Sequence, residues 1–219
     1  LLEKQIDFRR IRESGTVELL IAATDVATGR ARLFRRAELT VDVVLASACL
    51  PTLHHAVEIG GRAYWDGGFS ANPDILTLAT ESPHEDTLIV QLNALEKPQV
   101  PRSASEIADQ VNTITFNQPL LRDIAQIVEA KEASLGWLTP RRSRIARLQR
   151  HRFHLIEAAA YTSKLSPDSK SQPDRGMLEL LFKAGRQEAG SWLEERAHLV
   201  GRRPGVELAA RFLAAPEKL

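Results

Sequence analysis

Runs of apolar residues predict the strands of an α/β protein. Residues 17–24 form a continuous run of apolar and β-compatible residues, which is typical of a buried strand in such a sheet. The Thr28-Gly29 pair that follows predicts a turn into a partner strand at 31–34, and Ile59-Gly60-Gly61 predicts a hairpin turn into the strand that leads to Asp66. Further apolar runs predict strands at 63–65, 87–92 and 153–156.

Apolar residues at helical spacing predict the helices. Residues 1–13 and 41–50 carry apolar side chains three or four positions apart, with charged or polar residues between them. Ser103 with Glu106 can cap another helix, and Pro119 is expected to break that helix and to start a second one. Further helices are predicted at 177–200 and 206–213.

Prolines separate the sheet-forming part of the chain from the helical part. Residues 93–103 contain Pro98 and Pro101 and are typical of a linker. Strand signals predominate before this linker, and helix signals predominate after it. We therefore predict a partial α/β domain at residues 1–97 and a mainly helical extension at residues 98–219.

The charge balance and the single cysteine exclude several classes of protein. The 219 residues carry a net charge of +1, which argues against a nucleic acid as partner. Cys49 has no second cysteine to pair with, so we expect a core residue in a reducing compartment, the cytoplasm. No apolar run approaches the roughly 18 residues of a membrane span. His54 and His55 lack the spacing of metal ligands, so we expect neither a metal nor a cofactor.

The candidate chemistry centres on Asp66. This residue follows a short strand signal and precedes Gly67 and Gly68, so we expect its carboxylate at a strand end beside a tight turn. Glycine there allows positive φ and lets other chain segments come close. Asp25 is a rival carboxylate, but an aspartate ahead of Thr-Gly already serves to start a turn. Ser47, a rival nucleophile, lies within a helical pattern and lacks flanking glycines.

The residues around Asp66 resemble one family. The chain reads A-S-x-x-x-P from Ala46, I-G-G-x-x-Y-x-D-G-G from Ile59, and N-P at 72–73, where Pro73 is expected in the first turn of a helix. This arrangement resembles the aspartate half of the bacterial patatin-like phospholipases, which are serine hydrolases of lipid acyl esters. The resemblance implies a partial patatin-like three-layer sheet. The segment T-F-N-Q-P-L-L-R-D at 115–123 resembles a C-terminal extension of some bacterial members, and we assign it no catalytic role.

The resemblance implies a Ser-Asp dyad in which Asp66 is the proton acceptor and Gly67 and Gly68 support the motif. The serine of a G-x-S-x-G elbow is absent from the 219 residues. Because the chain begins at Leu1 and its only methionine is Met177, we expect a piece of a longer protein. We therefore expect that the isolated chain is inactive, and that an apolar face is exposed where the missing half packs.

Two other functions stay open at this point. One is a catalytically inactive fragment that binds a lipid surface or another protein. The other is a Ser-His-Asp hydrolase that uses one of the six histidines, although His154 lies in a predicted strand and is expected to be packed.

A basic stretch is a candidate for peripheral membrane contact. Residues 133–156 include no acidic residue. Each basic group near an anionic lipid surface contributes about 1 kcal/mol to binding. The simpler interpretation is a solvated helix face that pairs with acids elsewhere on the chain. The candidate lipid contacts are Trp137, Arg141, Arg142, Arg144 and Arg147.

Overall fold

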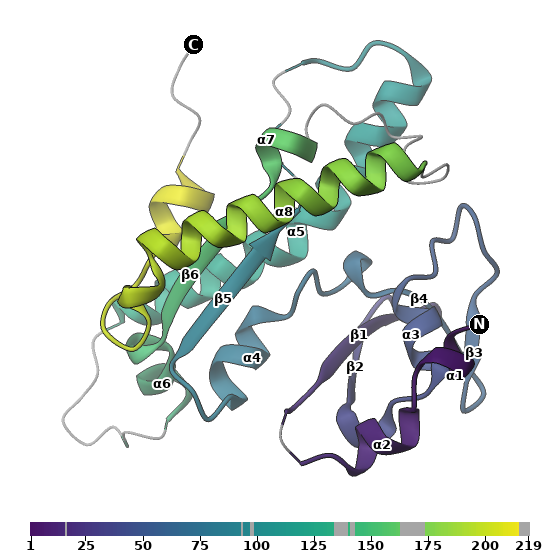
Figure 1. Ribbon diagram of the computed structural model, residues 1–219, viewed down its shortest axis with the longest axis horizontal. Coiled ribbons are helices and arrows are strands. Elements are labelled where there is room, and N and C mark those ends of the chain that lie inside the picture. Colours follow the sequence, from purple (N-terminus) through teal and green to yellow (C-terminus); the bar gives the residue numbers. More distant parts are fainter. Residues whose placement is uncertain are drawn as a thin grey trace. The chain divides into compact units, whose positions relative to one another are not determined.

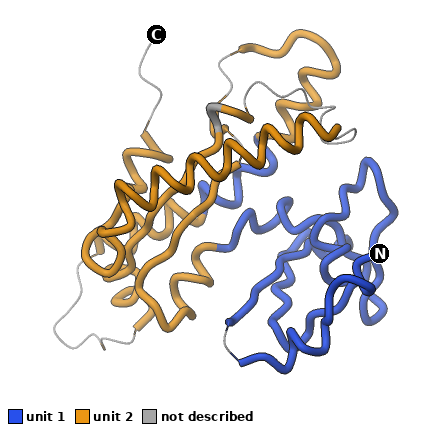
Figure 2. Tube along the Cα trace, viewed as in Figure 1, with its two compact units in different colours: residues 1–74, 114–122 blue, residues 75–113, 123–219 orange. Residues whose placement is uncertain are grey.

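The computed structural model describes residues 1–15, 17–92, 94–96, 99–133, 140, 143–162 and 174–214. The chain divides into two compact units (Figure 2). Unit 1 comprises residues 1–74 and 114–122, and unit 2 comprises residues 75–113 and 123–219. The predicted domain boundary, between residues 97 and 98, lies outside the described residues and stays a prediction.

Unit 1 contains a four-stranded antiparallel sheet in the order β2-β1-β4-β3 (Figure 1). Both hairpin turns use glycine with positive φ, at 66° for Gly29 and at 58° and 76° for Gly60 and Gly61. The predicted hairpins on either side of α3 are therefore confirmed. The strands are β1 (Leu20–Asp25), β2 (Ala31–Arg35), β3 (Val57–Ile59) and β4 (Arg62–Asp66).

Helix α3 (Val41–Ser47) packs on this sheet. It follows the short 3₁₀ helix η1 (Arg36–Glu38) and begins where the Thr40 hydroxyl accepts a hydrogen bond from the N–H of Val43, at 3.3 Å. The rings of Phe34 and Tyr64 meet edge to face, with 5.5 Å between their centroids. The core of unit 1 consists of Ala23, Phe34, Leu39, Val43, Ala46 and Tyr64.

The first thirteen residues form two helices, so the prediction of a single helix is wrong. Helix α1 (Leu2–Gln5) ends at Ile6, which has an extended backbone. Helix α2 (Phe8–Glu13) begins after Asp7, whose carboxylate accepts a hydrogen bond from the N–H of Arg10 at 2.9 Å. An aspartate that satisfies the N–H groups of the following turn favours a new helix start over continuation of the preceding helix.

Unit 2 is built on two parallel strands, β5 (Asp86–Gln91) and β6 (Arg152–Glu157). Side chains of β5 alternate, and the apolar Leu88 and Val90 are exposed while their neighbours are buried. Helix α8 contacts β6 and crosses the strand pair (Figure 1). The helices of this unit are α4 (Ile75–Glu81), α6 (Arg144–Arg150), α7 (Ala159–Thr162) and α8 (Arg175–Glu195), followed by the short helices η4 (Ala197–Leu199) and η5 (Ala209–Leu213).

Helix α5 (Ala104–Glu132) continues through Pro119, where the sequence predicted a break. Its predicted start is confirmed by a pair of reciprocal hydrogen bonds. The Ser103 hydroxyl accepts a hydrogen bond from the N–H of Glu106 at 3.2 Å, and the Glu106 carboxylate accepts one from the N–H of Ser103 at 2.9 Å. A proline inside a helix costs roughly 3 kcal/mol or more. Pro119 and Leu120 are buried, and so are Ile124 and Ile127, so burial of this helix face outweighs the cost.

Two helix boundaries differ from the predictions. Helix α4 begins at Ile75, so Pro73 lies ahead of the first turn rather than within it. The Asn72 side chain donates to the carbonyl of Phe116 at 2.9 Å, which holds this segment outside the helix. Helix α8 ends at Glu195 and is followed by the 3₁₀ turn η4, instead of extending to residue 200. The predicted fold class, α/β with a mainly helical C-terminal part, is confirmed.

Acid should destabilise unit 2 through His151. This ring is 2% exposed and shares a 2.7 Å hydrogen bond with the Thr87 hydroxyl. Burial, helped by the Lys131 cation, lowers the pKa of His151 to about 4. The unfolded chain therefore binds more protons between that value and the ordinary histidine pKa of about 6.5, and stability falls as the pH decreases through this window.

We expect the free energy of unfolding to fall by roughly 1–2 kcal/mol between about pH 7 and about pH 5, measured by urea denaturation. His151→Gln should reduce this difference, and the control His198→Gln, at an exposed position, should leave it unchanged. The same pH dependence in the parent chain and in His151→Gln would contradict the prediction.

Candidate active site

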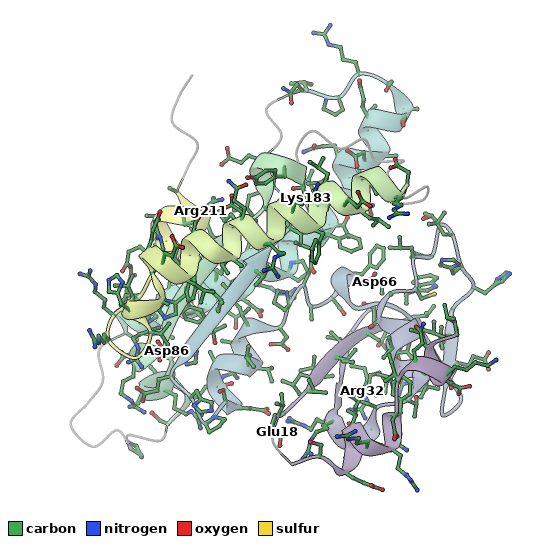
Figure 3. All side chains as sticks on the ribbon, in the orientation of Figure 1. Glu18, Arg32, Asp66, Asp86, Lys183 and Arg211 are labelled. Atoms are coloured by element: carbon green, nitrogen blue, oxygen red, sulfur yellow. The ribbon has the colours of Figure 1, made fainter. Side chains whose placement is uncertain are left out.

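Asp66 is the last residue of β4 (Figure 3), and several backbone contacts within unit 1 hold it. It pairs with Ala23 of β1, and its N–H donates to the carbonyl of Cys49 at 2.9 Å. The 3₁₀ turn η2 (Gly67–Phe69) follows directly. In this turn the N–H of Gly68 donates to Oδ1 of Asp66 at 2.7 Å. The Asp66 carboxylate is therefore oriented by the backbone of the turn that it starts.

Close packing, not backbone conformation, explains the two glycines. Neither Gly67 nor Gly68 has positive φ, so that part of the sequence interpretation is wrong. A Cβ on Gly67 would lie 2.2 Å from the carbonyl oxygen of Ala22. A Cβ on Gly68 would lie 2.4 Å from the ring of Phe116. The expectation that glycine lets other chain segments come close is confirmed at both positions.

Two hydroxyl groups support the backbone beside Asp66. The buried Thr24 hydroxyl donates to the carbonyl oxygen of Asp66 at 2.7 Å. It also shares a 2.8 Å hydrogen bond with the hydroxyl of Ser70. Sequence reasoning missed this pair, because the two residues are 46 positions apart and neither belongs to a motif with a characteristic spacing.

A segment of α5 completes this part of unit 1. The rings of Phe116 and Phe69 lie 4.7 Å apart between centroids. Asn72, four residues after Gly68, donates to the backbone carbonyl of Phe116 at 2.9 Å. Phe116 belongs to the 115–123 segment, to which the sequence analysis assigned no role. Only the resemblance of that segment to a known extension singled it out, and nothing in its local pattern indicated contact with Asp66-Gly67-Gly68.

Asp25 has the structural role that the sequence predicted. Its carboxylate accepts hydrogen bonds from the N–H and the hydroxyl of Thr28, both at 2.9 Å. It also accepts from Nε of Arg62 at 2.6 Å. The Arg62 guanidinium, together with Thr28, keeps the pKa of Asp25 below its usual value. Asp25 therefore holds the β1–β2 turn and the β4 strand together.

Ser47 and Cys49 also have structural contacts. The Ser47 hydroxyl donates to the carbonyl of Val44 at 2.8 Å, inside α3. Cys49 is buried, and its thiol lies 3.1 Å from the carbonyl oxygen of His55. Burial raises the pKa of the Cys49 thiol, which disfavours the thiolate. These contacts support the interpretation of both residues as parts of the fold rather than nucleophiles.

His154 is packed, as predicted. Nε2 of this histidine shares a 3.0 Å hydrogen bond with Asp86, which resembles the His-Asp part of a catalytic triad. The ring is only 1% exposed, however, and lies edge to face against Trp192. A Cβ on Gly205 would come within 2.6 Å of Nδ1, so no substrate could reach that nitrogen without a rearrangement. His154 is therefore a structural residue in unit 2.

The structure covers only part of the predicted lipid-contact stretch. Trp137, Arg141 and Arg142 lie outside the described residues. Arg144 is exposed at the start of α6, whereas Arg147 donates to the carbonyl of Ser82. Arg147 also borders a cavity of about 350 Å³ in unit 2, which does not include Asp66. The cavity is lined by Ala79, Ser82, Pro83, His84, Glu85, Arg147, Arg150 and His151.

The described residues contain neither a candidate metal site nor a candidate membrane span. Within those ranges, no three histidine, cysteine, aspartate or glutamate side chains come together as metal ligands would. No helix that could be described is both long enough and apolar enough to cross a bilayer.

Gly67→Ala should destabilise unit 1, because its Cβ would meet backbone rather than a movable side chain. We expect a loss of about 1–3 kcal/mol in the free energy of unfolding, the range for overpacked cores, measured by urea denaturation. Gly15→Ala is the matched control, since a Cβ there meets nothing within 4 Å and the backbone φ is not positive. Equal stability of the two variants would contradict the prediction.

Comparison with known proteins places one segment of the chain in a family. No curated protein is significantly similar to the chain. Residues 4–79 match the family model described as patatin-like phospholipase. The matched range contains all four strands of unit 1 and the Asp66-Gly67-Gly68 motif. The resemblance to the patatin-like family is thereby confirmed for residues 4–79, which form a patatin-like segment.

Proposed function

We propose that the chain is part of a lipid acyl hydrolase, a phospholipase or esterase, in which Asp66 is the proton acceptor of a Ser-Asp dyad. The observation that carries the proposal is the position of Asp66 within the patatin-like segment. Its carboxylate stands at a strand end and is oriented by the N–H of Gly68. Because the 219 residues contain no G-x-S-x-G motif, the serine would come from polypeptide outside this chain.

In the proposed reaction, the Asp66 carboxylate takes the serine proton while the serine oxygen attacks the ester carbonyl. Asp66 gives this proton to the departing alcohol as the acyl-enzyme forms. Water then attacks the acyl-enzyme, Asp66 accepts a proton from the water and returns it to the serine, and the fatty acid is released. A carboxyl group has an ordinary pKa near about 4, so it is a weak base toward an alcohol. The reaction would therefore depend on stabilisation of the oxyanion and on exclusion of water.

An exposed apolar side of unit 2 supports the proposal that another half completes the enzyme. Parallel strands are usually covered on both faces. Leu88, Val90 and Leu92 are nevertheless 42%, 62% and 60% exposed. Polypeptide that carries the serine would cover this apolar surface. An inactive fragment that binds other molecules would expose the same surface, so activity has to distinguish the two.

The family implies a lipid ester as substrate, whereas contact with a membrane surface stays a prediction. Arg144 is exposed and available for such a contact. Arg147 is engaged by the Ser82 carbonyl, which favours a structural role for this arginine. The cytoplasmic location expected from the lone cysteine also stays a prediction.

Asp66→Asn should strongly reduce hydrolysis by the intact protein. The amide keeps the shape of the carboxylate but cannot accept the serine proton, so we expect kcat on a phospholipid or p-nitrophenyl ester to fall by about 10²–10⁴. Asp42→Asn, at an exposed position in the first turn of α3, should retain activity. Unchanged hydrolysis by Asp66→Asn would contradict the proposal. If substitution of a histidine abolished hydrolysis instead, a Ser-His-Asp enzyme would be favoured.

A fluorophosphonate probe should leave the isolated 219-residue chain unlabelled, because this chain has no elbow serine. The intact protein should be labelled at a single serine upstream of this chain, as found by mass spectrometry. A labelled serine within the 219 residues would contradict the proposed division of the dyad.

A further inference from the structure

The Phe116 ring lies against the turn that orients Asp66. A Cβ built on Gly68 would fall 2.4 Å from Cε1 and 2.6 Å from Cδ1 of this ring. Real Cβ contacts are not that short, so the ring occupies the space that any larger residue would need. Since Gly68 does not have positive φ, its backbone could accept another residue. Oδ1 of Asp66 lies 3.1 Å from the same Cβ position, so the ring of Phe116 makes the shortest contact and is the main reason for glycine at position 68.

The same ring contacts the next residue of the turn. Phe69, the last residue of η2, stacks at a tilt on Phe116 with 4.7 Å between centroids. The backbone of α5 is fixed at this point as well, because Asn72 donates to the carbonyl of Phe116. A three-residue 3₁₀ turn has little stability of its own. Packing against Phe116 thus holds Gly68 and Phe69 in place.

We propose that Phe116 is a positioning residue for Asp66. It presses on the η2 turn and thereby keeps the N–H of Gly68 on Oδ1 of Asp66, where the hydrogen bond measures 2.7 Å. The inference rests on the proposed role of Asp66 as proton acceptor. It gives a function to the 115–123 segment: α5 supplies the support on which the carboxylate is oriented.

A double-mutant cycle in the full chain tests the contact. Gly68→Ala should lower the folding equilibrium constant about tenfold or more, as overpacking does. In the background of Phe116→Ala the same substitution should cost much less, because the ring is gone. Gly15→Ala, at an open position of unit 1, should have the same effect with and without Phe116. An additive cycle for Gly68 and Phe116 would overturn the inference.

Amide hydrogen exchange separates positioning from general packing. In Phe116→Ala, the Gly68 amide should exchange about tenfold faster or more, relative to the Ile21 amide of β1. Leu39→Ala, which truncates a core side chain of the same unit outside the strands, should accelerate both amides alike. If the Gly68 amide responds no more to Phe116→Ala than to Leu39→Ala, Phe116 is a packing residue only.

These outcomes are independent of the proposed reaction. Failure of the intact protein to hydrolyse esters would remove the function of Asp66 but leave the coupling between Phe116 and Gly68 unaffected. Additive effects of the Gly68 and Phe116 substitutions would contradict the positioning role of Phe116. The activity test on Asp66→Asn would still be valid.

Discussion

The close approach of β1 and α5 to two adjacent glycines determines where the Asp66 carboxylate lies. Gly67 meets the backbone of Ala22, and Gly68 meets the ring of Phe116. Neither glycine is needed for its conformational freedom, since both have ordinary φ. The turn is confined from two sides, and within it the Gly68 N–H points at the carboxylate. The orientation of a charged group is thus set by steric fit between backbone and side chains from separate parts of the sequence.

In unit 2, a cluster of charged and polar side chains around Asp86 holds separate elements together. Asp86 accepts two hydrogen bonds from Arg152, at 3.0 and 2.6 Å, and one each from the N–H of Gly201 and from His154, at 3.0 Å. The Arg152 guanidinium keeps the pKa of Asp86 far below its usual value. These bonds join β5, β6 and the turn after η4. A parallel pair of only two strands has few backbone hydrogen bonds, so side-chain bonds across its end add to its stability.

Local patterns predicted the hairpins of unit 1 correctly, because a glycine turn between two apolar runs is determined by residues that are neighbours in the sequence. They also predicted Asp66 at a strand end. They failed wherever distant residues decide the outcome. Pro119 normally breaks a helix, but burial of Leu120 and Ile124 outweighs this effect. The residues near Pro119 in the sequence do not predict that burial. For the same reason the contacts of Thr24 with Ser70 and of Phe116 with Gly68 could not be found from spacing.

Among the described residues, Asp25 and Asp66 end strands and Asp86 begins one, and the partners of Asp25 and Asp86 indicate the roles of these two aspartates. Asp25 binds Arg62, and Asp86 binds Arg152. A guanidinium partner lowers the pKa of a carboxyl group and makes it a poorer proton acceptor, and both aspartates show this shift. Such a residue is well suited to hold strands together and badly suited to act as a base. Asp66 accepts a hydrogen bond from a backbone N–H of its own turn, which fixes the direction of its carboxylate. Asp25 and Asp86 are therefore structural residues, whereas the proposal for Asp66 rests on its position at the end of a strand within the patatin-like segment.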